Sequence, residues 1–244
     1  MKSFLWFFRN GAVALWSLLC FSLPAIYASP SQSQTAQRMD IRDFVRQLFV
    51  HGTPFEEASQ YGAEEVPILL QMLNDSAEES YWPNIAVVLC VIGDERAVDP
   101  LIAFIEQKTS DTLSYSHHKA ITSTLIAFGY LINKSGSPKA LEYLQASVNP
   151  RVWRERNLTW KSSYQASSED RDLELSTVAI LGLGVSGHPD AGKTLRTLQE
   201  RASEPGIQSF RVQMSEVVKQ ALEAHDFISQ SGLKAYYQQR AEQE

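Results

Sequence analysis

A short apolar motif recurs along this chain, and it constrains the fold more than any other feature of the sequence. At a shift of 32 residues, Val66, Leu69, Leu70 and Leu73 match Val98, Leu101, Ile102 and Ile105. Segments of the same form follow further on, so the chain is built from repeated units. The four related segments are residues 65–73, 97–105, 137–144 and 189–198.

The last three of these segments each follow an apolar stretch that ends near a glycine, namely 85–93, 120–129 and 175–187. Gly93 is suited to the left-handed end of a helix, and Asp94 is placed to cap the next one. Pro138 and Pro189 are allowed in a first helical turn. The predicted unit is therefore helix, short turn, helix, and such pairs bury their apolar faces only by stacking on neighbours.

Apolar residues recur at helical spacing from Met39 almost to the end of the chain. The runs 85–92 and 178–185 could be buried strands, but each lies inside a longer helical pattern, which favours helix. We therefore predict an all-α fold, an α–α superhelix of four or five helix pairs over residues 39–240. The final segment, through Tyr236 and Tyr237, is expected to cap the C-terminal end.

The stretch 84–102 contains Gly-Asp-Glu-Arg-Ala-Val at 93–98 and a downstream Leu-Ile pair. It resembles a HEAT-like repeat and is similar to the short HEAT repeats of phycobilisome-lyase-type proteins, with 175–198 matching more loosely. The resemblance covers roughly residues 54–225. It implies an α-solenoid whose curved face binds protein or peptide, and it implies no catalytic residues. The lyases attach pigments in the cytoplasm, so an exported chain fits that activity poorly.

The first 28 residues have the layout of a secretory signal peptide: Lys2 and Arg9, an apolar run from Gly11 to Leu23, and Ala28 at the cleavage point. The apolar run is short for a membrane span, although an uncleaved N-terminal anchor is the alternative. Residues 29–38 are polar and predict a flexible leader. The chain is therefore predicted to be exported, to a periplasm or to the medium.

Charge and cysteine content limit the partners and the source of stability. The signal segment carries two basic residues and no acidic one, so its removal lowers the net charge from −6 to −8. Such a chain repels nucleic acid, and it would meet a membrane only through an uncleaved signal segment. Cys20 leaves with that segment, which makes Cys90 the lone thiol, in an apolar run that predicts burial.

Residues 148–170 interrupt the repeats, and insertions in solenoids often form the binding face. Arginine and tryptophan are enriched in interface hot spots. Trp153, Arg154, Arg156 and Trp160 are therefore candidate partner contacts. The alternative is a lid whose tryptophans cover the adjoining core. Replacing both tryptophans by alanine separates the two: a large fall in melting temperature supports the lid.

Two glycine patterns invite a nucleotide site. Residues 187–194 match the P-loop pattern, which would place Lys193 and Thr194 on phosphates and Mg²⁺. However, only 50 residues follow, and they offer no further strand. Residues 182–187 spell G-x-G-x-x-G without a βαβ context, so tight helix packing explains these glycines better.

His117 and His118 are adjacent, so their side chains point about 100° apart on a helix and are poorly placed to share one metal ion. We expect both to be exposed. The sequence as a whole predicts an exported scaffold that binds a protein or peptide, without catalysis, cofactor or metal. The alternative is a nucleotide-binding protein that uses residues 187–194. Neither the partner's identity nor an oligomeric state is specified by the pattern.

Overall fold

The computed structural model describes residues 38–49, 52–108, 112–163, 165–202 and 208–241. The predicted signal segment and all but the last residue of the predicted leader lie outside these ranges. From Met39 onward the chain forms one compact unit. Among the described residues, no helix is both long and apolar enough to cross a membrane.

The described chain is mostly helical, with almost no strand, which confirms the all-α prediction. Two-residue strands β1 (Thr112–Leu113) and β2 (Lys161–Ser162) pair in parallel and are the only strands among the described residues. The two ambiguous apolar runs are helices, as expected. The helices are α1 (Ile41–Val45), α2 (Phe55–Ala58), α3 (Val66–Leu73), α4 (Trp82–Ile92), α5 (Val98–Ile105), α6 (Tyr115–Ser135), α7 (Pro138–Ser147), α8 (Pro150–Glu155), α9 (Ser168–Ser186), α10 (Pro189–Ala202) and α11 (Gln208–Ala241), with 3₁₀ turns at η1 (Ser76–Tyr81) and η2 (Glu95–Ala97).

The turns between helices follow the predicted local chemistry. Gly93 ends α4 with φ of 72° and Gly187 ends α9 with φ of 58°, both in the left-handed region that glycine adopts without strain. Asp94 accepts a hydrogen bond from the backbone N of Arg96 at 2.9 Å and so caps η2. Pro138 and Pro189 each open a helix, α7 and α10.

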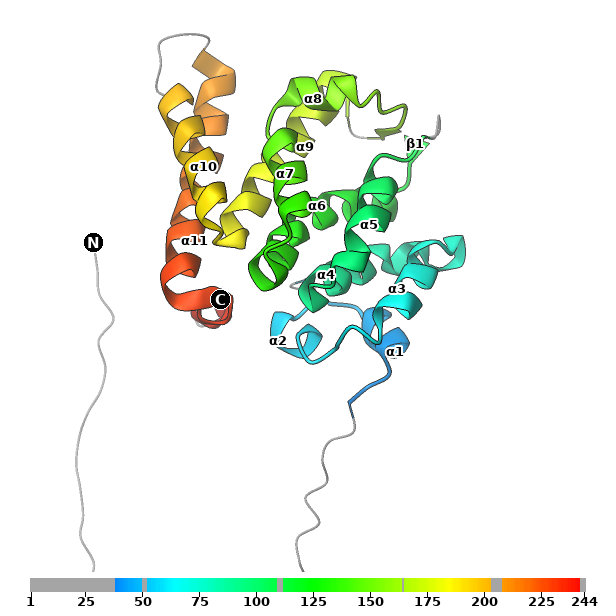
Figure 1. Ribbon diagram of the computed structural model, residues 1–244. Helices are drawn as coiled ribbons and strands as arrows, with labels where there is room; N and C mark the ends of the chain where they lie inside the picture. The colour runs from blue at the N-terminus through cyan, green and yellow to red at the C-terminus, as the bar shows by residue number, and fades with distance from the viewer. Residues whose placement is uncertain (1–37, 50–51, 109–111, 164, 203–207, 242–244) are drawn as a thin grey trace, which may run out of the picture. The chain divides into compact units, whose positions relative to one another are not determined.

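The longer helices pack against one another in chain order: α4 on α6, α6 on α9, and α9 on α11 (Figure 1). The shorter helices α7 and α10 each pack against the long helix that precedes them and the one that follows. Leu89, Leu125 and Leu183, from three successive long helices, are fully buried in one core. Burial of each such side chain contributes about 1.5–3 kcal/mol. Cys90 lies in the same core, as predicted.

Glycine allows α6 and α9 to approach closely. A Cβ on Gly129 would lie 2.3 Å from the carbonyl oxygen of Gly182, and a Cβ on Gly182 would lie 2.3 Å from the carbonyl oxygen of Leu125. Similarly, a Cβ on Gly184 would lie 2.7 Å from the carbonyl oxygen of Ala221 on α11. The G-x-G-x-x-G pattern is therefore a helix-packing feature, as the sequence favoured.

Candidate functional site

The interruption at 148–170 folds as the short helix α8, an irregular segment with β2, and the start of α9. Its two tryptophans, Trp153 and Trp160, are both 0% exposed. The indole N–H of Trp153 donates to the carbonyl of Ser147 at 2.8 Å, and that of Trp160 donates to the carbonyl of Ile105 at 3.3 Å. Neither ring is available at the surface, so the prediction that these two tryptophans contact a partner is wrong. Both rings cover the core, as the lid alternative predicts.

Arg156 is held inside the same lid. Its guanidinium carbon lies 4.1 Å from the ring centre of Tyr143 and 4.3 Å from that of Trp153. It also donates to Oγ of Ser147 at 2.8 Å and pairs with Glu106 at 3.0 Å. The side chain is 13% exposed, so it is largely committed to the fold. Of the four candidate contacts, only Arg154 is exposed.

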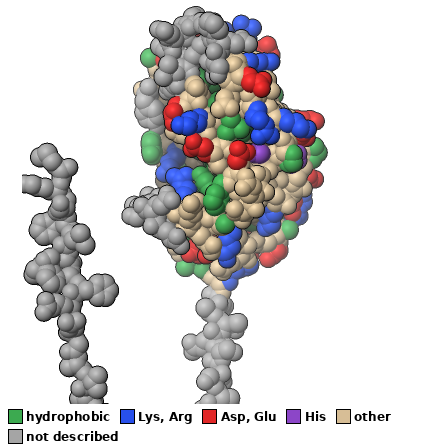
Figure 2. Space-filling view, turned by 90° about the vertical axis from the view of Figure 1, so that its left-hand side faces the viewer, with side chains coloured by type: hydrophobic (Ala, Val, Ile, Leu, Met, Phe, Trp, Pro, Cys, Tyr) green, Lys and Arg blue, Asp and Glu red, His purple; other side chains and the backbone are tan. Residues whose placement is uncertain are grey.

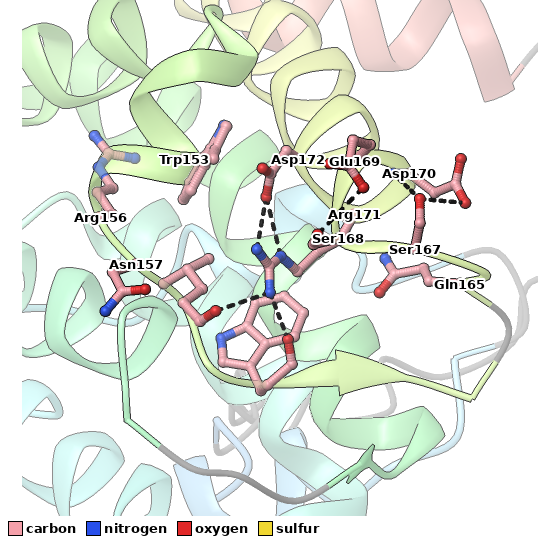
Figure 3. Close-up of polar contacts among 12 residues, drawn as sticks. Trp153, Arg156, Asn157, Gln165, Ser167, Ser168, Glu169, Asp170, Arg171 and Asp172 are labelled. Atoms are coloured by element: carbon pink, nitrogen blue, oxygen red, sulfur yellow. Dashed lines mark hydrogen bonds and ion pairs between the residues drawn. The ribbon is translucent and has the colours of Figure 1, made fainter.

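A buried charge pair fastens the lid to α9 (Figure 3). Nη1 of Arg171 donates to the carbonyls of Leu158 and Trp160 at 3.0 and 2.7 Å, and Nη2 lies 2.8 Å from Oδ1 of Asp172. Ser167 caps α9, and its hydroxyl accepts from the backbone N of Asp170. Asp170 lies in the first turn of α9, where the helix dipole favours an acidic side chain, whereas Asp172 is buried and pairs with Arg171.

The expectation of two exposed histidines is wrong, because both pack against aromatic rings. His117 lies 4.8 Å from Trp82 and 5.2 Å from Phe104 between ring centres, and its partial burial lowers the pKa of the imidazole. His118 is buried, with Nε2 3.3 Å from the carboxylate of Glu174. Hydrogen bonds from His118 and Gln165 hold the pKa of Glu174 below its usual value.

Across the described ranges, no group of three or more His, Cys, Asp or Glu residues could hold a metal ion. His118 and Glu174 approach each other without a third ligand of those types. The two side chains form a hydrogen-bonded pair in which His118 is buried and Glu174 is partly exposed.

A groove of about 640 Å³ lies between α10 and the segment where α7 ends and α8 begins; we call it the α7–α10 groove. Among the described residues that line it, two are cationic, Lys193 and Arg201, and none is acidic. Nε2 of Gln145 donates to Oγ1 of Thr194 at 2.9 Å and ties the two walls together. The lining comprises Gln145, Ala146, Val148, Asn149, Pro150, Val152, Lys193, Thr194, Thr197, Leu198, Arg201 and Met214.

The groove brings together two segments that the sequence singled out for separate reasons. The start of the interruption, Val148–Val152, supplies one wall, and the P-loop-like residues Lys193 and Thr194 supply part of the other. The sequence did not predict that these two segments lie side by side, because they are more than 40 residues apart in the chain. The recurrence of outer helices at 137–144 and 189–198 was the signal that could have placed them side by side.

The P-loop-like segment lacks the geometry that phosphate binding requires. It follows helix α9 rather than a strand, and from Pro189 onward it is the first turns of α10 rather than a loop. Lys193 pairs with Asp190 at 2.7 Å, and the hydroxyl of Thr194 donates to the carbonyl of Asp190 at 3.1 Å. The backbone N–H groups of a helix interior point along its axis and form no phosphate cradle.

Charges of both signs are interspersed over the face formed by α10 and α11 (Figure 2). The chain also carries a net charge of −6. The groove lining itself holds two cations and no acid, and one of these cations, Lys193, pairs with Asp190 on the same helix.

A comparison with protein-family models, curated proteins and solved structures found no match to this chain. The HEAT-like resemblance therefore stays a prediction from the residues that carry it.

Proposed function

We propose that this chain is an exported α-solenoid scaffold of the HEAT-like kind, which binds a protein or peptide partner and performs no catalysis. The partner segment lies in the α7–α10 groove. The observation that carries this proposal is the lining of that groove, which combines apolar side chains with the cations Lys193 and Arg201.

The order of helix packing supports a solenoid. Each of α4, α6 and α9 packs against the next long helix along the chain, and α7 and α10 each cover the junction between two of them. Stacked repeats present extended surfaces on which solenoids bind partners. The α7–α10 groove is formed where residues of successive helix pairs meet.

The chemistry of the groove selects the partner. Val148, Pro150 and Leu198 contribute apolar groups to the lining, and Asn149 and Gln145 contribute amides, of which that of Gln145 already binds Thr194. Arg201 favours a carboxylate on the incoming segment, whereas Lys193 on the same lining already pairs with Asp190. The best-fitting occupant is therefore a peptide segment with apolar side chains beside aspartate or glutamate. Arg154, exposed on the neighbouring α8, is the remaining candidate contact from the interruption.

Site-specific photo-crosslinking tests this proposal in the cells that make the protein. Benzoylphenylalanine at Thr197, an exposed position in the groove, is expected to form a discrete adduct with one partner. The matched control is the same probe at Glu200, which is exposed on the same helix but does not line the groove. Equal adducts at both positions would contradict a binding groove.

Charge reversal then tests the role of the cations. Arg201→Glu is expected to lower the adduct yield at Thr197 roughly tenfold, because a like charge at an interface rim opposes an acidic partner. The control is Lys219→Glu, an exposed cation on α11 that lies outside the groove. If both reversals reduce the yield alike, the effect is one of net charge and the groove is not the contact surface.

A further inference from the structure

The last nine residues of α11 pack in a small core of their own. Val185, Ile228 and Leu233 are its buried members, separate from the main core. Tyr236 and Tyr237 pack around them, together with Ile126 and Tyr130 of α6 and Phe55 of α2. The C-terminal end of the chain therefore lies beside α2 instead of simply capping the last repeat (Figure 1).

The contacts of this segment are specific. The ring of Tyr237 stacks on Phe55 with centres 5.2 Å apart and an angle of 16°, and its hydroxyl pairs with that of Tyr130. Glu56 accepts a hydrogen bond from Gln238 at 3.0 Å and pairs with Lys234 at 3.5 Å. We call the surface formed by Phe55, Glu56, Ile126 and Tyr130 the acceptor surface, and residues 233–241 the C-terminal helix.

One residue joins the C-terminal helix to the rest of α11. Gly232 has φ of 84° and ψ of 160° inside an otherwise helical segment. This backbone region is essentially restricted to glycine, because a Cβ would clash with the neighbouring peptide. The joint is exposed over four residues, so a change in its backbone angles disturbs no core packing there. These residues are Ser229, Gln230, Ser231 and Gly232.

If Gly232 takes helical angles, α11 becomes one continuous helix and the C-terminal helix leaves the acceptor surface. Leu233, Tyr236 and Tyr237 would then project from the molecule, and Phe55 and Tyr130 would lose their cover. The C-terminal helix and the acceptor surface fit each other within one copy. The same two surfaces therefore also fit when they belong to different copies.

We propose that two copies of this chain exchange their C-terminal helices, with Gly232 as the hinge and the acceptor surface of each copy holding the helix of the other. The exchanged dimer keeps every contact of the closed monomer, so the two states differ only in the hinge and in the entropy of association. This inference does not depend on the α7–α10 groove.

Gly232→Ala tests the hinge directly. Alanine disfavours the closed angles and favours the straight helix, so the association constant of the dimer should rise by at least about tenfold. Light scattering coupled to size exclusion, over a concentration series, measures this rise. Ser231→Ala, one position earlier on the exposed joint, should leave the association unchanged. A Gly232→Ala chain that stays monomeric with an unchanged concentration profile overturns the proposal.

A second variant shows whether the dimer uses the acceptor surface. Phe55→Asp in the Gly232→Ala background places a charge where Tyr237 stacks, and is expected to return the chain to the monomer. Retained helical circular dichroism distinguishes this loss from unfolding. A folded double variant that still dimerises overturns the exchange, because its interface lies elsewhere.

Cross-linking between unlike copies provides the positive evidence. Glu56→Cys and Gln238→Cys are made in separately tagged Gly232→Ala chains that also carry Cys20→Ser, since Cys90 is buried. A short bismaleimide added to the equimolar mixture should join one copy of each kind. A single chain that keeps Gly232 and carries both Glu56→Cys and Gln238→Cys should instead form the link within the monomer. Absence of the mixed product in a dimeric sample overturns the exchange.

Discussion

Nη2 of Arg171 lies 2.8 Å from Oδ1 of Asp172, and both side chains are buried although the residues are adjacent in the sequence. The pair does more than neutralise itself. The remaining donors of Arg171 hold the carbonyls of Leu158 and Trp160, so the irregular segment before β2 is fixed to α9 through one guanidinium. The stability of the lid therefore depends on a charged side chain that is almost completely shielded from water.

Arg171→Met should destabilise the chain by about 3–5 kcal/mol, because it leaves the carboxylate of Asp172 buried without its counter-charge. Two backbone carbonyls also lose their donor. Urea unfolding measures the free energy of unfolding of each variant.

The double variant Arg171→Met with Asp172→Leu should be less destabilised than Arg171→Met alone, since it removes the unpaired charge. Lys193→Met is the control: it breaks an exposed pair with Asp190 and should change the unfolding free energy little. If Arg171→Met costs no more than Lys193→Met, the pair is not buried as described.

Arg156→Lys should destabilise the lid although the charge is kept. A lysine ammonium lacks the planar guanidinium that lies close to the rings of both Tyr143 and Trp153. It also lacks the fork of donors with which Arg156 binds Ser147 and Glu106 together. We expect a loss of about 1–2 kcal/mol, from one cation–π and one charge-assisted hydrogen bond. Thermal unfolding compares it with Arg154→Lys, an exposed neighbour that should behave as the parent chain.

Trp153→Ala together with Trp160→Ala should lower the melting temperature sharply. Each truncation of a fully buried tryptophan costs about 3–5 kcal/mol, since it leaves a cavity. The indole N–H bonds to Ser147 and Ile105 are lost as well. A near-normal melting temperature would contradict the interpretation of this segment as a lid. It would favour the alternative, in which both tryptophans contact a partner.

Local chemistry made much of the fold predictable. Gly93, Asp94 and Gly187 specify their turns through backbone angles and capping groups that involve only nearby residues. The break at Gly232 was not predictable in this way. Its neighbours form a normal helical pattern, and the kink follows from contacts between Tyr237 and Phe55, which are 182 positions apart in the chain.

The candidate site was predictable only in part. The interruption at 148–170 and the segment 187–194 were both recognised, but composition alone does not show whether Trp160 faces solvent or Ile105. His118 similarly looks polar in sequence, yet it lies beside Trp160 and Glu174 because α6 and α9 cross there. Burial of polar residues depends on partners that are distant in the chain, and one sequence carries no local sign of them.

Glu174 should make the unfolding free energy depend on pH in the acidic range. Its pKa in the folded chain lies below the ordinary value of 4.5 because His118 and Gln165 stabilise the carboxylate. The stabilisation is fully present above the ordinary pKa and is lost as the pH falls through the folded value. Urea unfolding of the parent chain and of Glu174→Gln should therefore differ at pH 7 and converge at low pH. Glu142→Gln, at an exposed position on α7, should follow the parent at every pH.

Cys90 should be chemically silent until the chain unfolds. Its side chain is 0% exposed on α4, and burial among apolar groups raises the pKa of the thiol, so almost no thiolate forms at pH 8. Iodoacetamide should leave the Cys90 peptide unmodified in the native protein, as read by mass spectrometry after digestion. With added urea, labelling should rise along the same curve as the loss of helical circular dichroism, because exposure of the thiol requires α4 to leave the core.

A cysteine introduced by Ser231→Cys, on the exposed joint of α11, is the control. It should react at once in the native state, which shows that the reagent is active. Equal native rates at the two thiols would mean that α4 opens on its own, and the packing of α4 on α6 would then not be the stable centre of the fold.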